Sequence, residues 1–265
     1  LDEKRKKEIA SIKNEVKNMK HIIILLSIIT YAFSITGLEL AQLIESREKP
    51  NDIQSINTMV LTNKDNKVKT LELISISKDD SKMQMIWFLK PKKDKGIAFL
   101  KLEYDDKDDF MTMWLPGFSR FKRIKSSQKS DSFMGSDLSF EDLTNRTIND
   151  YNYKILNTDE EGFYYLESIP KGIESEYSKH ITKIKEIEKN IYIVFEEESY
   201  DKNNELIKNK IFNFKKINNY YIMNELKVRN VQKNHSTLLT VNDIELNNGF
   251  KDSKFSQRSL KIIPK

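Results

Sequence analysis

The sequence predicts a mainly β fold, in the form of a meandering antiparallel sheet or barrel with few helices. Three observations lead to this fold class. Segments with alternating apolar residues follow each other at close spacing, polar breaks such as Asn63–Asn66 and Asp201–Asn204 separate them, and helical periodicity is rare. Short strands joined by tight turns form antiparallel hairpins, so we expect consecutive segments to pair.

One amphipathic helix is expected before the first strand, over residues 38–48 (LELAQLIESRE). Leu38, Ala41 and Ile44 fall near one face at helical spacing. Pro50 follows, and because proline disfavours helical backbone at the residue before it, we expect the helix to end there.

Twelve segments are expected to form strands. In KMQMIWFLK and FMTMWLP, large apolar residues recur at every second position, which is typical of strands. The segments near the C-terminus have bulky residues on one face and Lys and Asn on the other, which fits a sheet with one solvated face. The expected strands cover residues 53–62, 67–78, 82–90, 96–104, 109–115, 151–157, 162–169, 180–188, 191–200, 205–216, 220–232 and 236–246.

The composition limits the possible kinds of site. The chain has 265 residues and no cysteine, which excludes disulfides, thiolate zinc sites and cysteine nucleophiles. Its formal charge is +5, but residues 1–34 carry seven basic and four acidic side chains, so the rest of the chain has a net charge of only +2. Such a balance argues against nucleic-acid binding, which needs a strongly basic surface.

The N-terminal region has the pattern of a secretory signal peptide over residues 19–34. A short basic start is followed by an apolar run from Ile22, and Ala32 and Ser34 form a small-residue cleavage site. We expect cleavage after Ser34 and export of the mature protein. The alternative is an uncleaved anchor in the inner membrane, because residues 22–38 carry no charge.

These assignments define the expected domain organisation. Residues 1–18 are expected to be an upstream extension that is not part of the fold. Residues 35–265 are expected to form a single domain, since no internal repeat and no sharp compositional boundary occurs there.

No motif for catalysis or metal binding is found. His21, His180 and His235 lack the spacing of a helical metal site, and neither a nucleophile elbow nor a phosphate-binding glycine loop occurs. The acidic run Asp105–Asp109 is better explained as a solvated turn than as a calcium site. We therefore expect no enzymatic activity, no metal and no cofactor; an envelope hydrolase with paired carboxylates is the least favoured alternative.

Residues 114–143 form the most distinctive stretch of the chain. A strand ending at Leu115 is followed by a Pro116-Gly117 turn and a basic arm. The arm is expected either to face water or to meet an anionic headgroup or an acidic partner. We call its four residues the basic rim: Arg120, Lys122, Arg123 and Lys125.

The second half of this stretch is expected to contain a short capped helix. Ser136 and Asp137 can accept hydrogen bonds from exposed N–H groups, and Ser139 with Asp142 has capping-box spacing. The neighbouring methionine and aromatic side chains would suit either a solid core or a cavity for acyl chains.

Two motifs in this stretch resemble the outer-membrane lipoprotein-sorting family related to LolA. They are W-L-P-x-x-x-R-x-x-R-I, at 114–124, and S-F-M-G-S-D-L-S-F-E-D-L, at 132–143. The order of parts also agrees, from the signal peptide to an ending with Phe255 and Leu260. The residues that carry the resemblance are Trp114, Leu115, Pro116, Arg120, Arg123, Ser132, Phe133, Met134, Gly135, Ser136, Asp137, Glu141, Asp142 and Leu143.

The resemblance implies an incomplete, strongly curved antiparallel β-barrel, covered by helices around an apolar cavity. It also implies a monomeric periplasmic carrier that binds the acyl chains of lipoproteins, or another acylated lipid, and moves them between the inner and outer membranes. An inner-membrane transporter and an outer-membrane acceptor would be its partners. The alternatives are an envelope sensor or interaction module on the same fold, or an accessory protein of a membrane lipid exporter.

Each apolar residue expected in this cavity has an equally good interpretation as plain core, because alternation identifies an apolar face without showing whether that face is hollow. The residues expected to line the cavity are Trp87, Leu89, Phe99, Met111, Met113, Trp114, Phe133, Met134 and Phe140.

Overall fold

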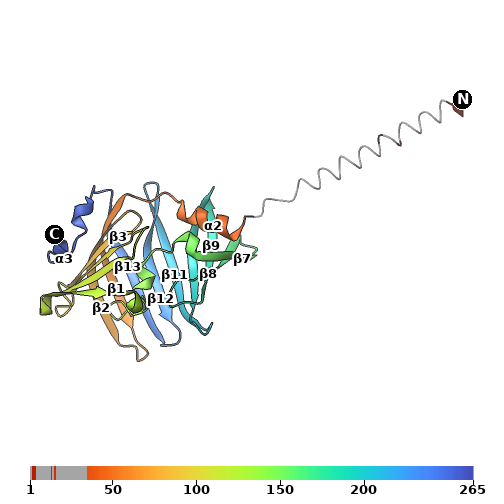
Figure 1. Cartoon of the computed structure of the whole chain (residues 1–265). Coiled ribbons are helices and arrows are strands. Elements are labelled where there is room, and N and C mark those ends of the chain that lie inside the picture. Colours follow the sequence, from red (N-terminus) through yellow and green to blue (C-terminus); the bar gives the residue numbers. More distant parts are fainter. Residues whose placement is uncertain (1, 4–12, 14, 16–34, 265) are drawn as a thin grey trace. The chain divides into compact units, whose positions relative to one another are not determined.

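The computed structural model describes residues 2–3, 13, 15 and 35–264, and residues 37–264 form one compact unit (Figure 1). The expected signal peptide at 19–34, with its cleavage site after Ser34, lies outside the described residues, as does most of the expected extension at 1–18. No helix in the described part of the chain is long and apolar enough to cross a membrane.

Thirteen antiparallel strands form one sheet that does not close into a barrel, because β6 and β7 form its two edges. This confirms the mainly β, incomplete-barrel fold class. Twelve strands match the expected segments closely, and the basic arm adds the short strand β6. The strands are β1 (Asp52–Thr62), β2 (Val68–Lys78), β3 (Met83–Lys90), β4 (Ala98–Leu102), β5 (Phe110–Leu115), β6 (Arg120–Ile124), β7 (Tyr151–Thr158), β8 (Phe163–Pro170), β9 (Lys179–Glu188), β10 (Ile191–Tyr200), β11 (Leu206–Ile217), β12 (Tyr220–Asn230) and β13 (His235–Leu246).

The chain starts in the middle of the sheet and returns there. Strands β1 to β6 run outward to one edge, and β7 to β13 run inward from the other edge until β13 pairs with β1. Residues 125–150 therefore connect the two edges, and we call them the crossing segment. Because they carry the second family motif, this topology places that motif across one face of the sheet.

We call the face under the crossing segment the inner face. Phe133 and Phe140 of the segment pack there against inner-face residues of β1 to β6, including Phe88 and Phe99, with ring centroids 5.3–5.8 Å apart. The segment itself contains the 3₁₀ helices η2 (Ser126–Gln128), η3 (Glu141–Leu143) and η4 (Ile148–Asp150); η1 (Pro116–Phe118) forms the turn before β6.

Helix α2 (Gly37–Glu45) packs against β7 and β10, with Leu40 and Ala41 buried. It begins one residue before the expected helix and ends three residues before the expected end. A Cβ atom on Gly37 would lie 2.8 Å from the backbone nitrogen of Lys154 in β7. Glycine at this position therefore allows the start of the helix to approach the strand backbone directly.

The C-terminal segment covers part of the opposite, outer face. It contains η5 (Asp252–Lys254) and α3 (Gln257–Leu260), which contacts β4 and β5. Phe255 and Leu260 are buried there, and Trp87 Nε1 donates a hydrogen bond to the carbonyl oxygen of Leu260 at 3.1 Å. Strands β2 to β5 are consequently buried on both faces.

Candidate functional site

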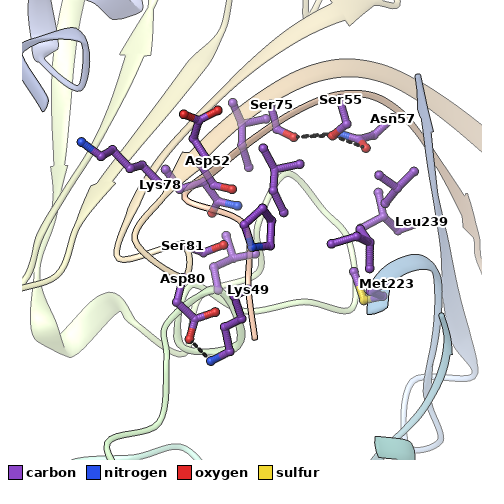
Figure 2. Close-up of a pocket in the computed structure, with 18 of the residues that line it drawn as sticks. Lys49, Asp52, Ser55, Asn57, Ser75, Lys78, Asp80, Ser81, Met223 and Leu239 are labelled. Atoms are coloured by element: carbon purple, nitrogen blue, oxygen red, sulfur yellow. Dashed lines mark hydrogen bonds and ion pairs between the residues drawn. The ribbon is translucent and has the colours of Figure 1, made fainter. Parts of the chain in front are cut away.

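A cavity of about 270 Å³ lies on the inner face, between the crossing segment and the central strands β1 to β3, β12 and β13 (Figure 2). Loop residues just before β1 also line it. Its position follows from the topology, since the central strands lie where the two halves of the sheet meet and the crossing segment passes over them.

One wall of the cavity is apolar. Phe133, Leu138 and Leu143 of the crossing segment line it, and Met223 and Leu239 lie side by side on β12 and β13 (Figure 2). Leu138, Leu143, Met223 and Leu239 belong to one apolar cluster, so this wall continues into packed core. Such a surface can shield an acyl chain from water.

The facing wall is polar, whereas the sequence led us to expect an entirely apolar cavity. Ser55, Asn57 and Ser75 form a ring of hydrogen bonds: Ser55 Oγ lies 3.1 Å from Asn57 Oδ1 and 3.0 Å from Ser75 Oγ, and Asn57 Nδ2 donates to Ser75 Oγ at 2.9 Å (Figure 2). Ser77 and Gln84 continue this wall onto β3 as cross-strand partners. We call these five residues the polar shelf.

Charged residues surround the cavity near Pro50. Lys49 forms an ion pair with Asp80, while both carboxylate oxygens of Asp52 accept hydrogen bonds from the backbone N–H groups of residues 248–250 at 2.7–3.1 Å. Arg47 has no ion pair within the described residues. Its guanidinium lies 5.2 Å from the ring centroid of Phe214, and burial lowers its pKa, which the charge of Asp80 only partly offsets.

The acidic residues of the second motif hold the crossing segment against the sheet. Asp137 Oδ2 accepts a hydrogen bond of 2.7 Å from Thr237 Oγ1 and also lies 2.7 Å from His235 Nδ1. Glu141 accepts hydrogen bonds from the Ser175 hydroxyl and from the backbone N–H of Glu176. These acidic side chains are thus structural anchors rather than free carboxylates.

Asp142 is the most deeply buried of these anchors. Lys208 Nζ lies 2.7 Å from its Oδ2 and Lys210 Nζ lies 2.5 Å from its Oδ1, while Tyr177 donates its hydroxyl hydrogen to the same carboxylate. Ser139 and Asp142 also exchange the expected capping-box bonds, with Ser139 N to Asp142 Oδ2 at 2.9 Å and Asp142 N to Ser139 Oγ at 3.2 Å. No helix starts at Ser136 and Asp137, contrary to expectation, because Asp137 binds β13 instead.

The charge network extends from Lys210 to β10. Lys210 Nζ lies 3.1 Å from Glu197 Oε1, and Arg146 binds both oxygens of Glu197 at 2.6 and 2.8 Å. His180 Nδ1 lies 3.2 Å from Arg146 and 3.0 Å from Ser199 Oγ. The inner face therefore has an apolar half under the crossing segment and a buried ionic half over β9 to β11.

The network shifts the pKa values of its members. Burial alone would raise the pKa values of Asp142 and Glu197, but the adjacent lysines and Arg146 lower both below their usual range. Burial and the charge of Arg146 lower the pKa of His180 well below its ordinary value. Burial and Asp142 raise the pKa of Tyr177. At neutral pH the carboxylates are charged, and the imidazole and phenol are neutral.

Sequence reasoning missed this network. Lys208 and Lys210 share one face of a strand, and Glu197 lies on the neighbouring strand, where it pairs across from Lys210. Two lysines at positions i and i+2 in an otherwise apolar face were the available signal, but alternation alone does not distinguish a buried charged face from a solvated one.

The structure divides the nine residues expected to line one cavity. Phe133 does line it. Trp87, Leu89 and Trp114 lie on the outer face instead. Trp87 and Trp114 pair with Ala98 on either side of β4, and Ala98 points to the face opposite to that of its neighbour Phe99. The other five pack in the inner-face core without lining the cavity: Phe99, Met111, Met113, Met134 and Phe140.

The basic rim lies on the edge strand β6 and the residue after it, and all four of its side chains are exposed. Arg120 lies over the ring of Phe118, and Arg123 donates to the carbonyl oxygen of Asp109 at 2.7 Å. Charged residues on an edge strand oppose unwanted pairing with other strands.

The remaining residues of the first motif shape the turn and the outer face. Trp114 packs on Phe121 with ring centroids 4.9 Å apart. Pro116 starts η1 and lies close to Gly96 in the turn before β4.

Gly135, in the second motif, has a φ of 82°, a backbone conformation that favours glycine. In the described residues, no three His, Asp or Glu side chains form a potential metal site.

Comparisons with known proteins agree with this architecture. A family model with the description "-like: Uncharacterized protein" matches residues 80–262. A search of curated proteins gives no match. Among solved structures, a putative outer membrane lipoprotein-sorting protein domain from Vibrio parahaemolyticus is 28% identical, with a TM-score of 0.79, covering 85% of this chain and 98% of the other.

Two further solved structures share the fold. A DUF1329 family protein from Desulfovibrio piger is 27% identical with a TM-score of 0.77, over 84% of this chain and 97% of the other. A LolA superfamily protein from Nitrosomonas europaea is 16% identical with a TM-score of 0.67, over 85% of this chain and all of the other; this shows a common fold alone.

The open thirteen-stranded sheet with its covered inner face therefore has the LolA-like fold, which agrees with the resemblance of the motifs. The chain belongs to the family whose model matches residues 80–262.

Proposed function

We propose that the protein is a periplasmic carrier that binds an acyl chain of a lipoprotein, or of another acylated lipid, in the inner-face cavity and moves it between the inner and outer membranes. The observation that supports this most directly is the apolar wall at Met223, Leu239 and Phe133, which lines the cavity of about 270 Å³. The lipoprotein-sorting domain with the same fold supports the choice of cargo.

Binding of this kind needs no catalytic group. Each methylene group removed from water stabilises the complex by about 0.8 kcal/mol, so a chain of several methylenes supplies enough free energy for retention. The acidic residues that a hydrolase would need, Asp137, Glu141 and Asp142, are occupied in anchoring the crossing segment. We propose accordingly that the protein is not an enzyme.

The basic rim is the surface that we propose for contact with a donor or an acceptor. An inner-membrane transporter and an outer-membrane acceptor are the partners of a carrier with this role. Reversing the charge with Arg120→Glu and Lys122→Glu should slow transfer of cargo to acceptor membranes while leaving uptake into the cavity unchanged. Equal transfer rates would remove the rim from this role.

The carrier function is tested by extracting the purified protein for lipid mass spectrometry and by titrating it with a fluorescent fatty acid. We expect a co-purified acylated lipid and saturable uptake of the probe. If extraction yields no lipid and the probe does not bind, the carrier function is wrong. The alternative of an envelope sensor would then be favoured by stable capture of a protein partner.

A further inference from the structure

The polar shelf is the feature of the cavity that a carrier of plain hydrocarbon chains does not need. Ser55 and Asn57 are 3% and 4% exposed, so their polar groups lie inside the protein and not at its surface. Ser55 pairs across from Ser75, and Ser77 pairs across from Gln84. The shelf is therefore a continuous polar patch over three neighbouring strands.

Part of the hydrogen-bonding capacity of this patch is unused. The buried Oε1 atom of Gln84 has no hydrogen-bond partner within the described residues. Asn57 Nδ2 donates one hydrogen to Ser75, and an amide nitrogen carries two. Buried polar groups are normally paired, so an unpaired acceptor beside a cavity is available to a hydrogen-bond donor of a bound ligand.

A second unpaired group lies near the same cavity. The buried Nε atom of Arg47 has no hydrogen-bond partner in the described part of the chain. Lys49 and Lys78, by contrast, are paired with Asp80 and Asp252. Arg47 is thus the cation among these residues that is free to bind an anionic group of a ligand.

The apolar wall, the shelf and Arg47 together specify an amphiphile with three parts. Its hydrocarbon chain lies against Met223 and Leu239, a hydroxyl or amide N–H near the head donates to Gln84, and an anionic head meets Arg47. We propose that the cavity selects anionic acyl compounds that carry such a donor close to the head, namely hydroxyacyl or N-acyl amide compounds, over plain fatty acids. This inference rests on the proposed carrier function.

The test measures dissociation constants by calorimetry for two matched pairs of probes. One pair is 3-hydroxytetradecanoate and tetradecanoate; the other is N-lauroylglycine and N-lauroylsarcosine, which lacks the amide hydrogen. We expect the donor to improve affinity about tenfold in at least one pair, as for a well-placed hydrogen bond. The pair that shows the effect identifies a hydroxyl or an amide as the donor.

Variants assign the effect to the residues. Gln84→Met keeps the length of the side chain and should reduce the ratio of the two dissociation constants within a pair to about one, while tetradecanoate binds as before. Arg47→Gln should weaken the binding of all four anionic probes and leave this ratio unchanged. Gln54→Met is the matched control, since Gln54 bonds to Glu245 and does not line the cavity.

Three results would overturn the inference. Equal affinities within both pairs in the unaltered protein would show that the shelf does not select a donor. A ratio that persists in Gln84→Met would show that Gln84 is not the acceptor. Failure of all four probes to bind would instead contradict the carrier function itself.

Discussion

Lys210 Nζ lies 2.5 Å from Asp142 Oδ1, and this ion pair joins the second sequence motif to strand β11. Both side chains are almost fully buried. A buried charge is tolerated only where its partners are in place, so the pair fixes the position of the crossing segment over the inner face. The wall of the cavity that Phe133 and Leu138 form depends on that position.

Asp142→Asn is expected to destabilise the protein by about 3–5 kcal/mol, because it removes the charge that compensates Lys208 and Lys210 while leaving both lysines buried. Urea unfolding followed by circular dichroism measures the change. Asp131→Asn is the matched control in the same segment; Asp131 is exposed, and we expect a change of less than about 0.5 kcal/mol. Equal stabilities for the two variants would contradict an anchoring role for Asp142.

His180 makes the stability of the protein depend on pH below neutrality. Burial and Arg146 lower its pKa in the folded state, so the unfolded chain binds a proton at His180 that the folded chain does not. Stability due to the neutral imidazole is therefore complete above the ordinary pKa of about 6.5 and falls as the pH decreases, by up to about 1.4 kcal/mol per pH unit.

The measurement is the free energy of unfolding of the protein and of His180→Asn between pH 8 and pH 5. The stability difference between the two should be constant above pH 7 and should shrink below about pH 6.5. The lowered pKa values of Asp142 and Glu197 act in a separate, more acidic window: their contribution is complete above the ordinary carboxyl pKa and is lost below it. Parallel curves for the two proteins down to pH 5 would refute the assignment to His180.

Most strands could be predicted from the sequence because the signals that define them are local. Each hairpin has its own polar turn, and several strands have one solvated face that preserves alternation. The face assignment of Trp87 failed for a physical reason: the C-terminal segment buries the outer face of β3, so both sets of side chains in that strand include large apolar residues. Which set faces the cavity depends on contacts that are distant in sequence.

The polar shelf and the ionic network were not predictable for a related reason. Ser75 and Ser77 alternate with Ile74 and Ile76, so a single-sequence interpretation assigns the serines to solvent and the isoleucines to the interior. In the structure the isoleucines lie on the outer face under the C-terminal segment, and the serines face the cavity. Alternation gives the period of a strand, while burial of each face is decided by the segments packed on it.

Leu260→Ala tests the cover on the outer face. Leu260 is 1% exposed, and removing its side chain should cost about 2–5 kcal/mol and change the fluorescence of Trp87, which donates to the Leu260 carbonyl. Ile262→Ala is the control, because Ile262 is 69% exposed and should matter little to stability. If both variants unfold at the same urea concentration as the unaltered protein, the C-terminal segment does not contribute to the core.

Leu239→Trp is expected to fill the cavity and abolish uptake of acyl probes without unfolding the protein. Leu239 is half-buried and lines the cavity beside Met223, so a larger ring there occupies space that is now empty. Overpacking of a well-filled core costs about 1–3 kcal/mol, but adjacent free volume reduces that cost. Leu238→Trp is the matched control, since Leu238 precedes Leu239 on β13, points to the other face and does not line the cavity.

Fluorescent fatty-acid titration of both variants, with circular dichroism to verify folding, distinguishes the outcomes. Undiminished uptake by folded Leu239→Trp would place the ligand outside this cavity, whereas loss of uptake confined to this variant locates the acyl chain between the crossing segment and β13.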